Sequence, residues 1–356
     1  MLQFKRFFWP VICGTLLSVV LIQQYPHLVG LPANPAQSFR TEHISFANAV
    51  SKATPSVVNI YTATKVRDKL PQRVRPSERT ELSLGSGIIM DAAGYILTNY
   101  HVIHDADQIL VMLFDGREAL ARVVGVDPDT DLAVLKIELG NLIPITVGDP
   151  NMARVGDVVL AIGNPYGFGH SVSQGIISAT GRYNLKLTKY ENYIQTDATI
   201  NRGNSGGALT DTNGNLLGIN SALFNPNSDS SDGIGLAIPA DTATHIMQSI
   251  IMNGRVVRGW MGVEVEQMRP NDLKALGLNQ GLLITGLNEG GPAFKAGLKE
   301  GDIITHINGR LINDARAAMN RIALSTPGQG VDIEYMREGI AYHTEIVVGT
   351  RPNSDN

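Results

Sequence analysis

The pattern of hydrophobic and polar positions changes several times along the chain, and the first stretch is an apolar run. Phe7–Ile22 carries no charge, follows Lys5 and Arg6, and is far from the next charged residue, Arg40. As a helix this run reaches ~24 Å, and ~28 Å if it continues to Tyr25, which is close to the ~30 Å hydrocarbon core of a bilayer. The pattern predicts one transmembrane helix.

The flanks of this run indicate an uncleaved anchor rather than a signal peptide. A signal peptide has a shorter apolar region followed by an A-x-A-like site, whereas Pro26, Pro32 and Pro35 follow here. The positive-inside rule places the basic start in the cytoplasm. We therefore expect residues 1–25 to form a cytoplasmic start and an anchor, held in the membrane through residues 7–25, with the rest of the chain exported.

The next stretches predict a tether and then a β domain. Residues 26–45 lack periodicity and indicate a tether, whereas residues 46–255 carry short β-branched runs separated by turn residues, typical of a barrel or sandwich. Strands are expected at Val57–Tyr61, Ile88–Met90, Ile109–Leu113, Val123–Val126, Leu132–Ile137, Val158–Ile162 and Ile176–Ser178. A helix is expected around Ala243–Ile251. The charged segment Lys65–Leu84 is expected to be an exposed loop, with contact to anionic lipid as the alternative.

Beyond residue 255 the pattern changes to mixed α and β, which predicts a small α+β domain over residues 256–350 and a tail over 351–356. The expected elements are strands at Leu282–Ile284, Ile303–Ile307, Val331–Met336 and Thr344–Val348, a turn at Asn308-Gly309, a short Ala-containing helix and a second helical stretch at Asp314–Leu324.

Composition narrows the function classes. The 356 residues suggest about two domains and an appendage. With 29 basic and 33 acidic residues the net charge is −4, so nothing favours binding to nucleic acid.

Cys13 is the single cysteine, which excludes an intrachain disulfide and a four-cysteine zinc site. The histidines are scattered and Gly167-Phe168-Gly169 is no phosphate loop. We expect no metal, no cofactor and an activity that resists chelators.

A serine stands between glycines in Gly203-Asn204-Ser205-Gly206-Gly207. Such a run exposes a hydroxyl and lets backbone N–H groups turn inward around an oxyanion, although by itself it more often marks a turn. His101 follows the strand-like Tyr95–Leu97, and Asp131 heads another predicted strand. Serine needs an imidazole to take its proton and a carboxylate to orient that imidazole. Ser205, His101 and Asp131 are therefore the predicted catalytic residues.

Asp131 has two competitors close by. Asp127-Pro128-Asp129 has the composition of a turn that projects both carboxylates into solvent. Asp131, at the point where the strand begins, is the better candidate. The remaining histidines lack a comparable setting and are expected to be surface or helix residues.

These motifs together resemble one protease family. The runs that carry the resemblance are Thr98-Asn99-Tyr100-His101-Val102, Asp129-Thr130-Asp131-Leu132-Ala133-Val134-Leu135-Lys136, Ile162-Gly163-Asn164-Pro165 and Gly203-Asn204-Ser205-Gly206-Gly207. In this order they are similar to the HtrA (Deg) family of serine proteases, over about residues 45–350. The resemblance implies a chymotrypsin-like double β-barrel, with Ser205 as nucleophile, His101 as general base, Asp131 orienting it, and the N–H groups of Gly203 and Ser205 forming the oxyanion hole.

The last domain resembles the PDZ domain of the same family. The resemblance lies in Gly290-Gly291-Pro292-Ala293-Phe294-Lys295-Ala296-Gly297-Leu298, Gly301-Asp302-Ile303-Ile304 and Ile307-Asn308-Gly309. PDZ domains add an extended carboxyl-terminal peptide to a sheet edge. Trp260-Met261-Gly262-Val263 resembles the carboxylate-binding loop. Met319 and Ile322, on the predicted helix, would receive the last peptide side chain, or they are ordinary core residues.

The resemblance also implies regulation and partners. Arg182 matches the arginine of an activation loop through which peptide docking relieves inhibition. The implied protein is a homotrimer in the inner membrane, with protease and PDZ domains in the periplasm. It senses carboxyl termini of misfolded outer-membrane proteins and cuts an anti-sigma factor. The alternatives are a general quality-control protease for unfolded chains and an inert peptide-binding scaffold.

Two further expectations concern the active-site surroundings. The residue six positions before the nucleophile is Thr199 rather than an acid. With Ile200, Ser221 and Leu223 as small or apolar candidates for the pocket wall, we expect cleavage after small aliphatic side chains. Arg202 precedes the nucleophile turn; it either affects how the Gly203 N–H turns inward or is a solvated loop charge.

Overall fold

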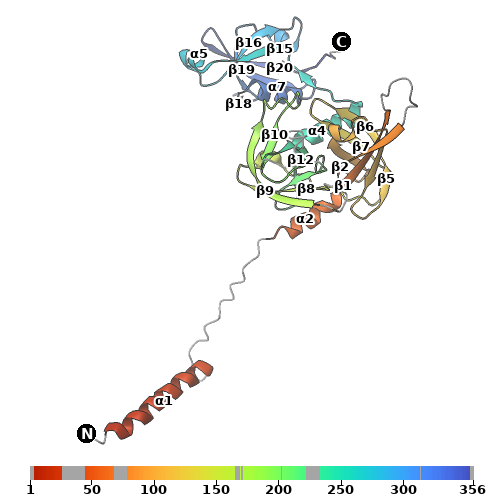
Figure 1. Ribbon diagram of the computed structural model, residues 1–356. Helices are drawn as coiled ribbons and strands as arrows, with labels where there is room; N and C mark the ends of the chain where they lie inside the picture. Colours follow the sequence, from red (N-terminus) through yellow and green to blue (C-terminus); the bar gives the residue numbers. More distant parts are fainter. Residues whose placement is uncertain are drawn as a thin grey trace. The chain divides into compact units, whose positions relative to one another are not determined.

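The computed structural model describes residues 4–25, 45–67, 78–164, 169, 171–201, 203–221, 233–312 and 314–352, and the side chains of all of these except residues 4–8, 66, 67, 78 and 79. The chain divides into two compact units, Met1–Ser45 and Phe46–Asn356 (Figure 1). Each is described by itself. The predicted tether, apart from Ser45, lies outside the described residues.

The first unit contains one helix, α1 (Phe4–Gln24). Its described apolar side chains are exposed, Trp9 and Leu17 among them. The hydroxyls of Thr15 and Ser18 donate to carbonyl oxygens of the preceding turn, which leaves no polar side-chain group of these residues without a partner. Among the residues whose side chains are described, no helix combines the length and the hydrophobicity needed to cross a membrane.

The second unit begins with α2 (Ala47–Ala53), a short 3-10 turn at Thr54–Ser56, and a seven-stranded antiparallel sheet. The strand order is β5-β4-β1-β2-β3-β7-β6. The strands are β1 (Val57–Arg67), β2 (Glu78–Ile89), β3 (Tyr95–Asn99), β4 (Gln108–Met112), β5 (Glu118–Leu120), β6 (Arg122–Asp127) and β7 (Leu132–Lys136). Alternating apolar residues fill its interior, including Ile60, Ile96 and Leu135.

The predicted loop at Lys65–Leu84 is wrong at both of its ends. β1 and β2 continue as a paired ribbon, in which Lys65 lies opposite Thr80 and Arg67 opposite Glu78. The two strands pair through their backbones, and exposed charged side chains do not disturb this pairing. A charged sequence can therefore form either an exposed ribbon or a loop. Residues 68–77 lie outside the described part.

Six further strands close into a barrel in the order β10-β13-β12-β11-β8-β9. They are β8 (Val158–Gly163), β9 (Ser171–Arg182), β10 (Tyr193–Thr196), β11 (Ala208–Thr210), β12 (Leu216–Ser221) and β13 (Gly235–Pro239), preceded by a 3-10 turn at Pro150–Met152. A shared core that includes Leu97, Leu132, Tyr193 and Ile219 joins the barrel to the first sheet. Helix α4 (Ala240–Asn253) packs on this core through Ile246 and ends at Gly254, which has φ 70°.

The remaining residues form a small α+β fold. Its main sheet runs β15-β16-β17-β19-β20, with β18 beside β17, and a separate pair joins β14 to β21. The elements are β14 (Gly259–Trp260), β15 (Val263–Gln267), α5 (Pro270–Ala275), β16 (Leu282–Leu287), α6 (Pro292–Lys295), β17 (Ile303–Ile307), β18 (Arg310–Leu311), α7 (Ala315–Ala323), β19 (Gly330–Arg337), β20 (Ile340–Val347) and β21 (Gly349–Thr350). Asp314 caps α7 by accepting the N–H groups of Arg316 and Ala317 at 2.8 and 3.0 Å.

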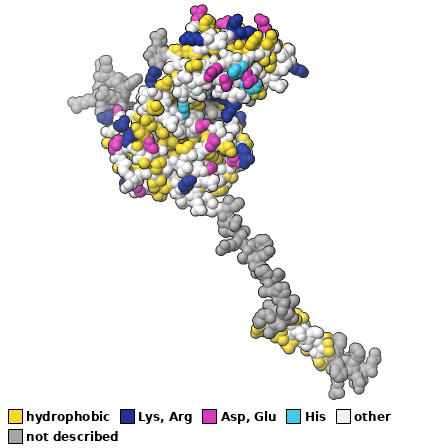
Figure 2. Space-filling view, turned by 180° about the vertical axis from the view of Figure 1, so that it is seen from behind, with side chains coloured by type: hydrophobic (Ala, Val, Ile, Leu, Met, Phe, Trp, Pro, Cys, Tyr) yellow, Lys and Arg dark blue, Asp and Glu magenta, His cyan; other side chains and the backbone are white. Residues whose placement is uncertain are grey.

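Charged side chains are mixed over the face of the second unit that Figure 2 shows, with basic and acidic groups interspersed. A nucleic-acid surface concentrates basic groups on one face. The surface in view therefore agrees with the balanced composition.

Candidate active site

His101 and Asp131 are joined by two hydrogen bonds. His101 lies in the short helix α3 (Tyr100–Ile103), directly after β3, and Asp131 immediately precedes β7. The carboxylate accepts the backbone N–H of His101 at 2.9 Å through Oδ1, and Oδ2 lies 2.7 Å from Nδ1. A carboxylate at Nδ1 favours the tautomer with its proton there, which leaves Nε2 able to accept one.

Asp131 is held in an uncommon backbone conformation. Its φ is 60°, in the left-handed region that few residues other than glycine adopt. Its carbonyl oxygen accepts hydrogen bonds from the Asn99 side chain and the Tyr100 N–H, both at 3.1 Å. The residue is 3% exposed, and the Ser221 hydroxyl lies 3.5 Å from Oδ2. The protein therefore fixes this carboxylate from the backbone and from the side chain.

The turn that carries Ser205 requires glycine on the side that follows the serine. Gly206 has φ 80°, and a Cβ there would lie 2.1 Å from the Ser86 carbonyl oxygen. A Cβ on Gly207 would lie 2.3 Å from the Ile162 carbonyl oxygen. Both distances are far inside contact range, so the glycines let the turn approach the neighbouring backbone closely.

Ser86 connects this turn with the strand that leads to His101. Its N–H donates to the Ser205 carbonyl oxygen at 2.9 Å, and its hydroxyl donates to the Gly203 carbonyl oxygen at 2.7 Å. Thr98, in β3, donates its hydroxyl to the Ser86 carbonyl oxygen at 2.7 Å. The structure thus brings the segment of His101 and Asp131 and the turn of Ser205 to the same junction between sheet and barrel.

Gly203, predicted to contribute to the oxyanion hole, lies in a tight turn. Asn204 N–H donates to the Asn201 carbonyl oxygen at 3.0 Å, which closes a four-residue turn, and φ of Gly203 is 92°. A positive φ at the third position of a turn is readily adopted by glycine, which has no Cβ. Arg202 lies outside the described residues, so its effect stays a hypothesis.

The expected pocket-wall residues are found in different surroundings. Thr199 is exposed, Ile200 is buried in the barrel core, and Ser221 lies against Asp131. Leu223 lies outside the described residues. The preference for small aliphatic side chains therefore remains a prediction.

All of the residues predicted for peptide binding line one groove of about 640 Å³. The groove runs between β15 and α7, with β14 at one end. Its lining includes Trp260, Met261, Gly262, Val263, Met319 and Ile322. Ile322 is also 9% exposed and part of the core, whereas Met319 is 39% exposed. Lys189 and Tyr190, from the loop before β10, also line the groove.

Arg182 lies at the end of β9, and its Nε donates to Oε1 of Gln195 at 2.8 Å. The loop that follows it is organised by Glu191, a buried carboxylate that accepts the N–H groups of Leu185 and Leu187 at 2.8 and 2.7 Å. The side chain of Asn320, in α7, donates to the Glu191 carbonyl oxygen. The loop and α7 are therefore in direct contact.

The sequence-based expectation for Asp127 is wrong. Its carboxylate is buried and accepts a hydrogen bond from Arg258 at 2.7 Å, whereas Asp129 is partly exposed and lies 3.7 Å from Lys189. A turn composition does not reveal a cationic partner that is distant in sequence. Tyr190, Glu191 and Arg258 belong to no recognisable motif, and their partners are likewise not evident from the local sequence.

His245, in α4, is expected to make stability depend on pH. Burial, and secondarily the charge of Arg258, lowers the pKa of His245 below its usual 6.5. The unfolded chain therefore binds a proton near pH 6.5 that the folded protein takes up only at lower pH. The stability contributed by neutral His245 is complete above pH 6.5 and is lost as the pH falls below it. The fall in Tm from pH 7.5 to 5.5 should be smaller in His245→Gln than in wild type.

His343→Gln is the matched control for this measurement, because the His343 side chain is 62% exposed. It should keep the wild-type fall in Tm. An equal fall in wild type and His245→Gln would contradict the prediction.

Comparison with known proteins identifies the class of both folds. Residues 85–219 match the trypsin-like peptidase domain, and residues 259–348 match the PDZ domain. The prediction of a mostly β protease domain followed by a PDZ domain is confirmed, and the protein is a serine endopeptidase.

The chain belongs to the HtrA family of serine proteases. It is 39% identical over 361 residues to the serine endoprotease DegS of Escherichia coli (strain K12), covering 98% of this chain and 99% of the relative. It is 40% identical over 283 residues to a probable periplasmic serine endoprotease, DegP-like, of Brucella suis biovar 1 (strain 1330), covering 78% of this chain and 55% of the relative. Among solved structures, the HtrA-type protease AlgW with decapeptide is 48% identical, with a TM-score of 0.70 and coverage of 87% and 100%.

Proposed function

We propose that this protein is a membrane-anchored periplasmic serine endopeptidase that is switched on by carboxyl-terminal peptides bound at its PDZ domain. The observation that carries the proposal is the His101–Asp131 pair, 2.7 Å apart, beside the glycine-bounded turn of Ser205. A serine protease uses these three groups together with N–H donors that stabilise the oxyanion. The groove on the same chain supplies a place for a regulatory peptide.

In this proposal Ser205 Oγ attacks the scissile carbonyl carbon while His101 Nε2 takes the hydroxyl proton. The N–H groups of Gly203 and Ser205 stabilise the oxyanion, and Asp131 stabilises the imidazolium. The imidazolium then gives its proton to the leaving amine, and an acyl-enzyme remains. Water, deprotonated by His101, releases the acyl group and restores Ser205.

Regulation is assigned to the groove and to the loop after Arg182. A peptide would add to β15, with its carboxylate at Trp260–Val263 and its last side chain near Met319. Two loop residues, Lys189 and Tyr190, lie at this groove, so an occupied groove and the loop share a contact surface. A peptide activates only if it binds the active conformation more tightly than the inactive one.

The proposal places the protein at the inner membrane and assigns it peptide and protein partners. The uncharged run Phe7–Ile22 would anchor a homotrimer in the inner membrane, with the protease in the periplasm. The basic residues Lys5 and Arg6 directly before this uncharged run support the anchor. The activating ligands would be carboxyl termini of misfolded outer-membrane proteins, and the substrate would be an anti-sigma factor.

The test is peptide-dependent cleavage. A fragment that begins after residue 26 is incubated with a candidate anti-sigma-factor periplasmic domain and a peptide ending in an aromatic residue. Cleavage should rise by about 5- to 150-fold, the usual range of allosteric coupling, and Arg182→Ala should blunt the rise. The control is the same peptide with an amidated carboxyl terminus. Equal rates with both peptides, or ready degradation of unfolded casein without peptide, would contradict the sensor role.

A further inference from the structure

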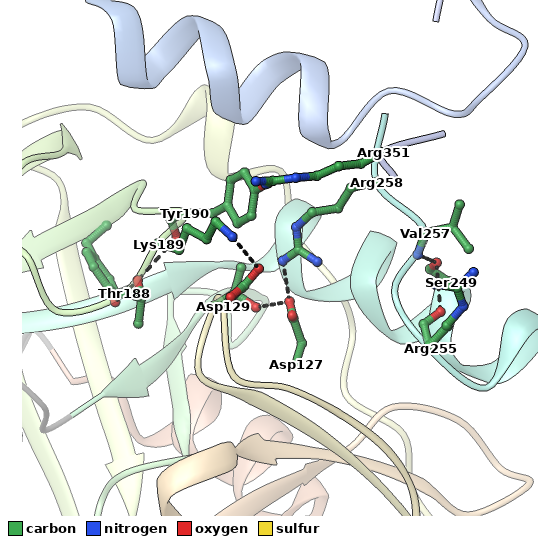
Figure 3. A network of polar contacts seen from close by, with 12 residues as sticks. Asp127, Asp129, Thr188, Lys189, Tyr190, Ser249, Arg255, Val257, Arg258 and Arg351 are labelled. Carbon is green, nitrogen blue, oxygen red and sulfur yellow. Dashed lines mark hydrogen bonds and ion pairs between the residues drawn. The ribbon is translucent and has the colours of Figure 1, made fainter. Parts of the chain in front are cut away.

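A buried ion pair lies directly behind the turn that carries Asp131. Asp127 and Arg258 join through Oδ2 and a guanidinium nitrogen at 2.7 Å, with side chains only 5% and 10% exposed (Figure 3). The Thr130 hydroxyl donates to the same carboxylate oxygen at 2.5 Å. The carboxylate of Asp127 is thus bound by a cation from one side and by the neighbour of Asp131 from the other.

The backbone bonds of this turn are long. Thr130 N–H donates to the Asp127 carbonyl oxygen at 3.3 Å, and Asp131 N–H donates to the Pro128 carbonyl oxygen at 3.4 Å. Asp131 itself has φ 60°, and such a conformation persists only when the surrounding structure supports it. The hydrogen bond from the Thr130 side chain to the Asp127 carboxylate adds a further contact that stabilises this turn.

Arg258 is itself held from both sides. Its guanidinium carbon lies 4.3 Å from the centre of the Tyr190 ring, and its carbonyl oxygen accepts the Arg351 N–H at 3.0 Å (Figure 3). Tyr190 N–H donates to the Asp129 carbonyl oxygen at 3.0 Å. Arg258 immediately precedes β14, whose Gly259 and Trp260 line the groove. Arg258 therefore links residues that line the groove to the turn that carries Asp131.

We propose that Asp127 is a positioning residue for Asp131, and that Arg258 is the counter-ion that holds the Asp127 carboxylate in place. The inference rests on the proposed role of Asp131 in catalysis. Without Arg258 the buried carboxylate lacks its cation, and without Asp127 the Thr130 hydroxyl lacks its acceptor. Either loss lets the turn relax and moves the Asp131 carboxylate relative to His101. A displacement of about 1 Å at a catalytic group costs on the order of a hundredfold in rate.

The experiment measures turnover per active site in the full-length protein. Wild type, Asp127→Asn and Arg258→Gln are titrated with a fluorophosphonate, which labels nucleophilic serine, and are then assayed on the candidate anti-sigma-factor periplasmic domain with the aromatic-ended peptide. We expect kcat per titrated site to fall about a hundredfold with KM nearly unchanged. Asp129→Asn is the matched control, because its carboxylate belongs to the same turn but is 41% exposed; it should keep its kcat.

Two Thr130 variants test the same contact while the buried Asp127–Arg258 ion pair stays intact. Thr130→Val keeps the shape and removes the donor, so kcat should fall about tenfold, whereas Thr130→Ser keeps the donor and should retain the wild-type kcat. If the variants only lower the fraction of sites titrated, with kcat per site unchanged, Asp127 is merely structural and the inference fails. If wild type is not labelled at Ser205, the proposed function fails, and the inference fails with it.

Discussion

Ser205→Ala is expected to lower kcat by about 10⁶-fold, which removes measurable peptide hydrolysis. In the proposed mechanism the hydroxyl is the only group that forms the covalent acyl-enzyme. The remaining oxyanion-hole donors and His101 cannot replace it, because in the proposed mechanism neither of them forms a covalent bond with the acyl carbon. The fold should tolerate the change, since alanine is smaller than serine and the close approaches in this turn involve the glycines that follow.

The measurement compares cleavage and fluorophosphonate labelling in wild type and Ser205→Ala. Ser51→Ala, at an exposed position in α2, is the matched control and should be labelled and active like wild type. Thermal unfolding checks that both variants are folded. Cleavage by folded Ser205→Ala at more than a hundredth of the wild-type rate would exclude Ser205 as the nucleophile.

Asp131→Asn is expected to lower kcat by about 10⁴-fold. Oδ1 accepts the His101 backbone N–H, and Oδ2 lies at Nδ1. An asparagine keeps the first bond only by placing its oxygen at the N–H, which turns its NH₂ group toward Nδ1. That donor forces the proton of the imidazole to Nε2, so Nε2 can no longer accept the proton of Ser205.

This loss should appear in kcat with little change in KM, because Asp131 is buried and out of reach of the substrate. Activity should return in part at high pH, because hydroxide can then take the proton of the serine hydroxyl in place of the general base. Asp129→Asn serves as the control from the same turn. A loss smaller than tenfold in Asp131→Asn would mean that this carboxylate does not select the tautomer of His101.

The strands with alternating or continuous apolar residues were predictable from the sequence. β17 begins and ends at the predicted residues, Ile303 and Ile307, and α4 contains the predicted periodic stretch with its glycine stop. The strands β10 to β13 escaped prediction for two reasons. β10 and β11 have only four and three residues, and Gly218, Asn220 and Gly235 interrupt the apolar character of β12 and β13. Their identity depends on closure of the barrel rather than on local pattern.

In the candidate site, too, some features were predictable from the sequence and others were not. The three groups of the proposed mechanism were predictable from the sequence, because each stands in a local motif whose residue types suit its task. The state of Asp127 was not predictable, because Asp127 is a turn residue by composition and a buried ion-pair partner in the fold. Its cation, Arg258, is 131 positions away, and no local pattern records which distant charge will meet it. Burial and pairing depend on how sheet, barrel and groove pack together, and so they become visible only in the folded chain.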